Sequence, residues 1–199
     1  MLSTPSRGPG RPRSQAADDS IRRAALELLD GGGYQALTIE GVAALAGVGK
    51  ATVYRRYRSK HELLRDLVER FREIDLPVPD TGSVREDLCL IVRNGIAVLT
   101  TSVWGRALPA LVAEQTADPE LADVARHFWR SRKDAVAIVI DRGVARGELR
   151  DDVDRGLAFD LVVCPMYFRF LVSNDELPDD LACRIVDEVM GGIASSRSR

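Results

Sequence analysis

The chain has 199 residues, a formal net charge of −2 and 45% hydrophobic residues. This length can bury a core in one domain, or in one small and one larger domain that share an interface. The near-neutral balance argues against a histone-like polycation, and 29% charged residues argue against global disorder. The charge is unevenly divided, because residues 1–75 carry 13 basic and 10 acidic side chains, a balance of +3, whereas residues 76–199 carry 15 and 20, a balance of −5.

The cysteines and the apolar runs indicate the compartment. Cys89, Cys164 and Cys183 are odd in number and far apart in apolar helical patterns, which does not describe a disulfide framework. The N-terminus lacks the apolar stretch of a signal peptide, and the apolar runs 135–140 and 161–168 are too short to cross a bilayer. We therefore expect a cytoplasmic protein with no membrane-spanning segment.

The N-terminal part begins with a polar arm and continues as helix. Residues 1–14 are mostly Pro, Gly, Ser and Arg, and we expect them to form a disordered basic arm. Apolar residues at helical spacing then predict a first helix over 16–30, which the glycine run 31–33 ends.

Three further helices are expected before residue 77. Thr38 is a good N-cap for a short second helix, and Gly47 stops that helix. A third short helix is predicted over 50–57. A capping box at 59–62 opens a fourth helix, which the prolines at 77 and 79 end. These helices complete a predicted N-terminal domain over residues 15–75.

The segment 76–82, LPVPDTG, is interpreted as a hinge before a C-terminal domain over 83–199. A second capping box at 83–86 opens this domain, and Asp118 followed by Pro119 predicts the start of a long helix. The predicted C-terminal helices run from residue 83, near 105–116, from 118 to 147, and over about 154–173 and 178–194. No convincing strand pattern is present, so the expected fold is all-α with about nine helices.

The two short helices around Gly47-Val48-Gly49 form the pattern of a helix-turn-helix over about 38–57. The turn needs a residue that adopts positive φ, and Gly47 supplies it. If Val42, Ala43 and Ala46 pack against Val53 and Tyr57, the opposite face of the second short helix is turned to solvent. That face is small, polar and basic, which suits the major groove of B-DNA.

The candidate DNA contacts divide by chemistry. Phosphate contacts set the register without reading sequence, whereas contacts to base edges specify it. The phosphate candidates are the Thr38 and Tyr54 hydroxyls and Lys60. The base candidates are Lys50, Thr52 and Arg55, with Ala51 against a thymine methyl group and Arg56 in either role. Arg11 and Arg13 of the arm are candidates for a narrow, AT-rich minor groove.

Each of these features also has a plainer interpretation. Thr38 is equally well explained as an N-cap alone, and Glu40 most simply complements the helix dipole. The basic face can be only solvated, and the arm can be a tail without a role. A P-loop is disfavoured, because Ala44 and Ala51 stand where the motif requires glycine and Ser or Thr.

Residues 16–75, and above all LTIEGVAALAGVGKATVYRRYRSKHEL at 37–63, resemble the DNA-binding domain of the tetracycline-repressor (TetR) family. The resemblance implies a homodimeric, all-helical transcription factor, generally a repressor. It also implies a C-terminal domain that binds a small-molecule inducer and thereby releases the operator. Carried over by motif, the recognition helix falls on 50–57, and the phosphate-contacting tyrosine and lysine fall on Tyr54 and Lys60.

A second copy of the chain is the expected partner of the penultimate helix. Residues 157–172 are apolar nearly all round except at Asp160 and Arg169, so every face of this helix needs cover. Together with the last helix it would form an intermolecular four-helix bundle, placing two recognition helices about 34–36 Å apart on a palindromic operator. The interface candidates are Leu157, Leu161, Leu181, Ile185, Val189 and Ile193.

An inducer cavity is expected between the long helix and its neighbours. The candidates are Trp104, Leu108, Leu111, Phe128, Trp129, Arg132, Tyr167 and Phe168, for each of which ordinary core packing is the alternative. Arg132 lies in an apolar stripe and needs an acidic partner, which would be Asp160, Glu114 or an acidic ligand. No His, Cys or carboxylate spacing supports a metal or cofactor site.

The sequence therefore predicts a dimeric, ligand-responsive repressor. An enzyme is disfavoured, because no nucleophile–base pair, carboxylate pair or cofactor loop is evident. The alternative is a helical small-molecule-binding or scaffold protein without operator binding. The basic recognition face counts against that alternative.

Overall fold

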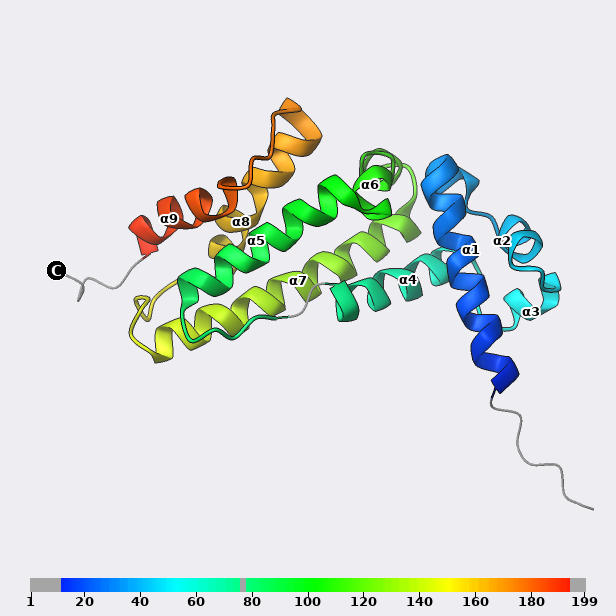
Figure 1. Ribbon diagram of the computed structural model, residues 1–199, viewed down its shortest axis with the longest axis horizontal. Coiled ribbons are helices and arrows are strands. Elements are labelled where there is room, and N and C mark those ends of the chain that lie inside the picture. Colours follow the sequence, from blue (N-terminus) through cyan, green and yellow to red (C-terminus); the bar gives the residue numbers. More distant parts are fainter. Residues whose placement is uncertain (1–11, 76–77, 194–199) are drawn as a thin grey trace, which may run out of the picture. The chain divides into compact units, whose positions relative to one another are not determined.

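The computed structural model describes the backbone of residues 12–75 and 78–193 (Figure 1). Within these residues the chain forms nine α-helices and one π-helical turn, with no extended strand, as the sequence predicts. The chain divides into two compact units after Leu67, here called unit 1 and unit 2. The division falls inside the fourth helix, ahead of the segment 76–82 that the sequence indicates as a hinge. Residues 76–77 of that segment lie outside the described residues.

Unit 1 contains the first three helices and the start of the fourth. They are α1 Pro12–Ala36, α2 Ile39–Ala46, α3 Lys50–Tyr54 and α4 Lys60–Asp75. Helix α1 begins four residues before the predicted start and ends six residues after the predicted end. The helix continues through the first two residues of the glycine run and is interrupted only at Gly33, where φ is 66° and ψ is −164°. Helix α3 ends at Tyr54, three residues before its predicted end.

A partly buried carboxylate, Asp66, joins the elements of unit 1. Arg22 Nε of α1 donates to Asp66 Oδ2 of α4 at 2.7 Å, and the Tyr57 hydroxyl donates to the same oxygen at 2.8 Å. Burial, assisted by the hydrogen bond to Asp66, raises the pKa of Tyr57 to about 12. The apolar core around this network includes Ile21, Leu29, Leu37, Val42, Val53, Leu63 and Leu64. The network therefore fixes α1, the residues after α3 and α4 against one another.

Unit 2 consists of the second half of α4 and five further helices. These are α5 Val84–Thr101, α6 Val103–Glu114, α7 Pro119–Ala145, α8 Arg155–Phe168 and α9 Leu181–Ile193. The side chains of Ser83, Asp118 and Asp154 accept backbone N–H groups at the starts of α5, α7 and α8. Helix α8 continues into the π-helical turn η1, Arg169–Ser173, which ends at Asn174 with φ 52°. The caps explain why the sequence predicts these helix starts closely.

The core of unit 2 lies between α5, α7, α8 and α9, which run beside one another in Figure 1. Its fully or almost fully buried side chains include Val84, Leu88, Val92, Val139, Ile140, Val162 and Val186. Leu108, Trp129, Tyr167 and Phe170 pack against this core while remaining partly exposed. Partly exposed aromatic side chains at the edge of a core are typical of small-molecule sites.

Candidate nucleic-acid interface

The turn between α2 and α3 is built around Gly47. Its backbone lies in the left-handed region at φ 66° and ψ 31°, where a side chain would be strained. The Gly47 amide donates to Ala44 O at 3.3 Å and the Val48 amide donates to Ala43 O at 3.0 Å. These two bonds end α2 and turn the chain, so that α3 begins three residues later at Lys50. The predicted role of Gly47 is confirmed.

Packing within unit 1 determines which face of α3 is exposed. Val42 and Ala43 of α2 and Val53 of α3 are buried, as is Tyr57 just after α3. The opposite face of α3 is consequently turned to solvent, and Thr52 lies half-buried at its border. The exposed residues of this face are Lys50, Ala51, Tyr54 and Arg55. We refer to these four residues as the recognition face.

Thr38 is placed for both of its predicted roles. Its exposed side chain accepts the Gly41 amide at 3.0 Å, which makes it the N-cap of α2. A hydroxyl that accepts from the backbone keeps its own hydrogen for donation to a phosphate oxygen. The positive end of the α2 dipole lies at the same place. The start of α2 is therefore suited to hold a phosphate beside the recognition face.

Glu40 contacts two residues of the recognition face. The Tyr54 hydroxyl donates to Glu40 Oε1 at 3.2 Å, and Lys50 Nζ lies 3.9 Å from the same oxygen. The negative charge of Glu40 raises the pKa of Tyr54. The sequence places Glu40 in the first turn of α2, but this position alone does not predict a contact with residues of α3. Without DNA, a carboxylate thus holds two groups that are candidates for DNA contacts.

Arg56 points inward, unlike its neighbour Arg55. Its Nε donates to Asp18 of α1, and its NH1 donates to Thr52 O at 3.1 Å. Only 19% of the Arg56 side chain is exposed. The structure therefore places Arg56 as a tie between α3 and α1 and not on the recognition face.

Lys60 is held over an aromatic ring at the start of α4. Its Nζ lies 3.8 Å from the centroid of the Tyr34 ring, and the Tyr34 hydroxyl is 2.6 Å from His61 Nε2. This contact restricts a flexible side chain before any phosphate arrives. Of the two candidate arginines in the arm, Arg11 and the side chain of Arg13 lie outside the described residues.

The predicted inducer-contacting residues separate into two groups in unit 2. The Trp129 ring lies 5.1 Å from Phe128 and 5.0 Å from Tyr167, measured between centroids. Arg132, one turn of α7 further on, is buried with 8% exposure. Burial raises the pKa of Tyr167 to about 12, and the positive charge of Arg132 acts in the opposite direction. The structure thus brings Phe128, Trp129, Arg132 and Tyr167 together at the edge of the core.

The other inducer candidates lie elsewhere. Trp104 packs on Phe71 of α4 with 5.2 Å between ring centroids, and Leu108 and Leu111 of α6 are half-buried. Asp160, one expected partner of Arg132, pairs with Lys133 at 3.1 Å. Phe168 is 57% exposed, on the solvent side of α8.

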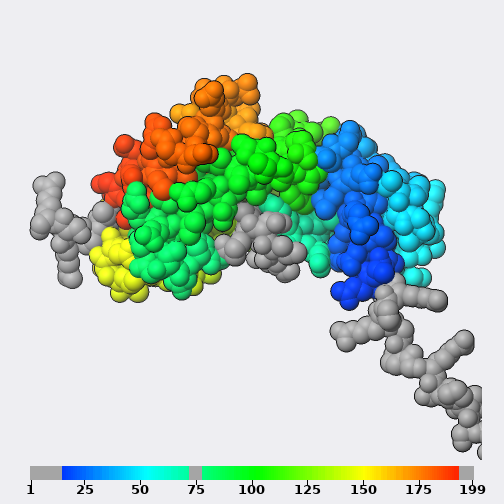
Figure 2. All heavy atoms as spheres, viewed as in Figure 1, coloured from blue at the N-terminus to red at the C-terminus, as the bar shows by residue number. Residues whose placement is uncertain are grey.

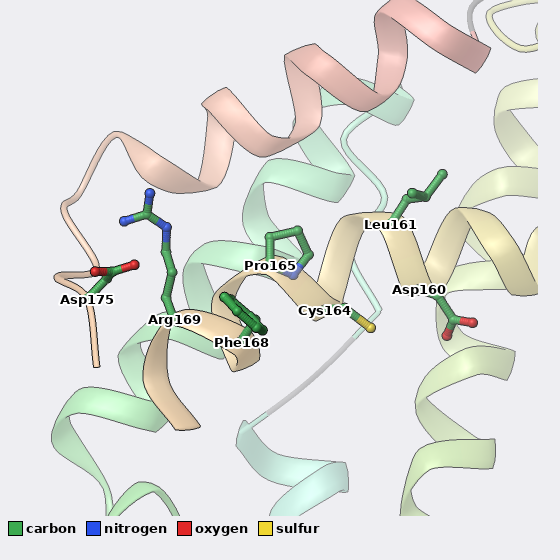
Figure 3. Close-up of a pocket in the computed structure, with 7 residues that line it drawn as sticks. All are labelled: Asp160, Leu161, Cys164, Pro165, Phe168, Arg169 and Asp175. Carbon is green, nitrogen blue, oxygen red and sulfur yellow. The ribbon is translucent and has the colours of Figure 1, made fainter. Parts of the chain in front are cut away.

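An open groove of about 400 Å³ follows the solvent side of α8 (Figure 3). It is lined by Asp160, Leu161, Cys164, Pro165, Phe168, Arg169 and Asp175. The groove contains only one of the predicted inducer contacts, Phe168, so it is separate from the Trp129 cluster. Its exposed apolar lining belongs instead with the expected dimer surface.

The candidates for the dimer interface are only partly available to a partner. Leu157 and Leu161 of α8 are 56% and 45% exposed, as an interface requires. Leu181 and Ile185 of α9 are buried in the core of unit 2, where a partner cannot reach them. Val189 packs partly against the same core, and the side chain of Ile193 lies outside the described residues.

Helix α8 and the turn η1 together expose a long apolar surface. Residues Arg155–Ser173 are long and apolar enough to cross a membrane by length and composition, and 28% of this segment is buried in the chain. The segment is longer than the apolar run 161–168 that it contains. Its η1 end, orange in Figure 2, projects at the outer edge of unit 2. Several apolar side chains of this segment, among them Leu157, Leu161, Phe168 and Val172, are therefore left exposed by the chain itself.

Across the residues that the structure describes, no group of three His, Cys, Asp or Glu side chains is arranged to hold a metal ion. The described features of unit 1 are instead those of a helix-turn-helix. The turn at Gly47 positions α3, whose exposed face carries a lysine, an arginine and a tyrosine. This face lies next to the start of α2. The fold and this face define the class of helix-turn-helix DNA-binding proteins.

Comparison with known proteins identifies the family. Residues 21–67 match the family described as "Bacterial regulatory proteins, tetR family", and residues 78–189 match the "Tetracyclin repressor-like, C-terminal domain". The chain therefore belongs to the TetR family of transcriptional regulators, which confirms the resemblance noted in the sequence.

Individual relatives agree along nearly the whole chain. The chain is 31% identical over 188 residues to an uncharacterized HTH-type transcriptional regulator, YdeS, of Bacillus subtilis, covering 94% of each. It is 30% identical over 183 residues to the DNA-binding transcriptional repressor TetR of Mycobacteroides abscessus, covering 89% of this chain and 94% of that one. The crystal structure of the TetR family transcription regulator SCO0332 superposes with a TM-score of 0.75 at 30% identity, covering 88% and 97%. These relatives are named as transcriptional regulators, not enzymes.

Proposed function

We propose that this TetR-family regulator is a cytoplasmic repressor that binds a palindromic operator as a homodimer and is released by a small-molecule inducer. The observation that carries the proposal is the recognition face next to the Thr38-capped start of α2. Lys50 and Arg55 are directed to base edges, and Ala51 leaves room for a close approach to a thymine methyl group. Thr38, Tyr54 and Lys60 are directed to phosphates.

The homodimer is supported by the exposed apolar surface of α8 and η1. Leu157, Leu161, Phe168 and Val172 are each at least 45% exposed and recur at roughly helical spacing along one side. A second copy offers the same surface, and a two-fold axis would place the two against each other. The α8–η1 surface thus replaces the α9 residues as the centre of the proposed interface.

The inducer is proposed to bind at the cluster formed by Phe128, Trp129, Arg132 and Tyr167. Aromatic walls with one buried guanidinium suit a molecule that has an apolar body and an acidic group. Two contacts join the second half of α4 to the neighbouring helices, since Phe71 packs on Trp104 of α6 and Glu69 Oε1 lies 2.6 Å from His127 Nε2 of α7. A ligand that displaces α6 or α7 would therefore move α4, which continues into unit 1.

Operator binding is tested with fluorescently labelled DNA from the region flanking the gene, by fluorescence anisotropy at fixed salt. The double variant Tyr54→Phe plus Lys60→Ala removes two phosphate contacts per protomer, and we expect at least about 30-fold weaker binding and a shallower salt dependence. Arg150→Ala is the control, because it removes an exposed cation of unit 2 that pairs with Asp152 and lies outside both the recognition face and the α8–η1 surface. Equal affinity of the double variant and the control would refute the assigned DNA surface.

The inducer site is tested with an anionic aromatic dye, 8-anilinonaphthalene-1-sulfonate, as the probe. We expect dye binding to quench the fluorescence of Trp129 in the Trp104→Phe variant, and Arg132→Gln to weaken dye binding by about tenfold. Loss of quenching in Trp129→Phe, with Trp104 retained, completes the expected pattern. Dye binding that is unaffected by Arg132→Gln would show that the probe binds elsewhere.

A further inference from the structure

Two of the three cysteines meet in unit 2 although they are distant in the sequence. Cys89 lies in α5 and Cys183 in α9, and these helices lie beside each other in Figures 1 and 2, green and red respectively. Cys89 is part of the buried core, and Cys183 packs against that core. The third cysteine, Cys164, is exposed on α8.

The cysteine pair belongs to two facing rows of side chains. On α5, Arg85, Cys89 and Arg93 follow one another at intervals of four residues, so they share one face of the helix. On α9, Cys183 and Asp187 are also four residues apart. Arg85 pairs with Asp187 at 2.6 and 2.9 Å, and Arg93 NH2 lies 3.6 Å from the Cys183 sulfur. Cys89, midway between the two arginines on α5, therefore faces Cys183, one turn before Asp187 on α9. The two rows are thus antiparallel and in register.

The two sulfurs have unequal surroundings. Cys183 is partly exposed, and Arg93 NH2 lies 3.6 Å from its sulfur. Cys89 has 4% exposure, and burial raises the pKa of its thiol to about 12. Thiolates react with peroxides, and a neighbouring guanidinium stabilises the anionic sulfur. Access and charge therefore favour Cys183 as the sulfur that reacts first, with Cys89 positioned to react second.

We propose that Cys89 and Cys183 form a peroxide-reactive thiol pair that closes a disulfide between α5 and α9. The Cys183 thiolate attacks one oxygen of a hydroperoxide, the O–O bond breaks, and the other oxygen leaves as an alkoxide or hydroxide that takes up a proton. Cys183 is then a sulfenic acid. The Cys89 thiol attacks this sulfur, the S–O bond breaks, and the sulfenic oxygen leaves as water with the thiol proton. The two thiols are oxidised by two electrons and the peroxide is reduced.

This inference concerns the chemistry of unit 2 and does not depend on operator binding. The experiment exposes the full chain to hydrogen peroxide without reductant, then measures intact mass and maps the linked peptides. We expect a loss of about 2 Da and a Cys89–Cys183 peptide in the wild type and equally in Cys164→Ser, the matched control. Cys183→Ser should form no such link, and Cys89→Ala should accumulate a sulfenic acid on Cys183 that dimedone traps.

The role of the guanidinium is tested by rate. We expect Arg93→Gln to slow the loss of thiols by about fivefold, whereas Arg184→Gln, on the exposed side of α9, should leave the rate unchanged. Circular dichroism verifies that each variant is folded. The proposal is overturned if folded wild-type protein shows no 2 Da loss in about 1 mM peroxide, or if its only product is a Cys164–Cys164 link between chains.

Discussion

Helices α3 and α8 each leave one face uncovered by the rest of the chain, and the two faces differ in chemistry. The exposed face of α3 holds a lysine, an arginine, a tyrosine and an alanine, whereas that of α8 holds leucines and a phenylalanine. A polar face is stable in water and is available for a polar partner, but an apolar face of this length requires cover. We propose DNA as the partner of the exposed face in unit 1 and a second protomer as the partner of the exposed face in unit 2.

The largest effect is expected on self-association through the apolar face of α8. Leu161→Glu plus Phe168→Glu would bury charges without partners in the proposed dimer interface, so we expect self-association at least about 100-fold weaker, a cost of about 3 kcal/mol. Sedimentation velocity at micromolar concentration should show a shift from dimer to monomer.

Leu45→Glu is the control for this pair. Leu45 of α2 is 46% exposed, practically the same as Leu161 at 45%, but it lies in unit 1. Its substitution should leave the dimer intact. If the wild-type protein is monomeric at these concentrations, the exposed apolar face of α8 is not a dimer interface.

The next effect concerns the turn that presents the recognition face. Gly47→Ala forces an L-residue into the left-handed region, and we expect it to lower the free energy of unfolding by about 1–2 kcal/mol. Gly31→Ala is the matched control, because Gly31 is helical and an added Cβ meets nothing within 4 Å. That substitution should be neutral or stabilising by up to about 1 kcal/mol in urea denaturation. A harmless Gly47→Ala would contradict the role given to this turn.

Two adjacent arginines, Arg55 and Arg56, test which residues belong to the polar face of α3. Arg55 is exposed, so Arg55→Ala should weaken operator binding by about tenfold and leave stability unchanged. Arg56 is bonded to Asp18, so Arg56→Ala should cost about 1 kcal/mol of stability. Once folded, the Arg56 variant should keep the wild-type salt dependence of binding. If Arg56→Ala weakens operator binding and Arg55→Ala does not, Arg56 turns outward when DNA is bound.

The smallest effect is expected at Glu40. Glu40→Gln removes a negative charge that pairs with Lys50 and attracts the Tyr54 hydroxyl, so we expect about threefold tighter binding to any DNA at moderate salt. Glu27→Gln, at an exposed position on α1, serves as the control and should change affinity less. If Glu40→Gln weakens binding to the operator but not to random DNA, Glu40 reads a base and does not merely restrain α3.

Local signals in the sequence identify most of the fold. Capping residues such as Ser83, Asp118 and Asp154 place the starts of α5, α7 and α8, and Gly47 places the end of α2, because each acts on the backbone within four residues. The glycine run 31–33 interrupts the first helix as the sequence predicts, but only at its last residue, Gly33, because glycine permits a break without requiring one at each position. Helical residues resume after Gly33 and extend α1 to Ala36.

Contacts between distant residues could not be predicted in this way. The apolar period of α9 indicates a buried face, but it does not distinguish the core of the same protomer, where Leu181 and Ile185 lie, from a partner. Arg56 fits a basic surface pattern equally well whether or not it meets Asp18, 38 residues away. Cys89 and Cys183 are far apart in the sequence, yet the packing of α5 on α9 places them on facing sides of the two helices.

The position of Lys60 over the ring of Tyr34 has a practical consequence for chemical footprinting. The chain has only three lysines: Lys50 belongs to the recognition face, Lys60 is a candidate phosphate contact at the start of α4, and Lys133 lies in unit 2. An amine-acylating reagent that labels side chains therefore samples the candidate operator surface at two positions, with Lys133 as an internal reference. The ratio of labelling at these positions would report operator occupancy in unmodified cells, without a tag or a mutation.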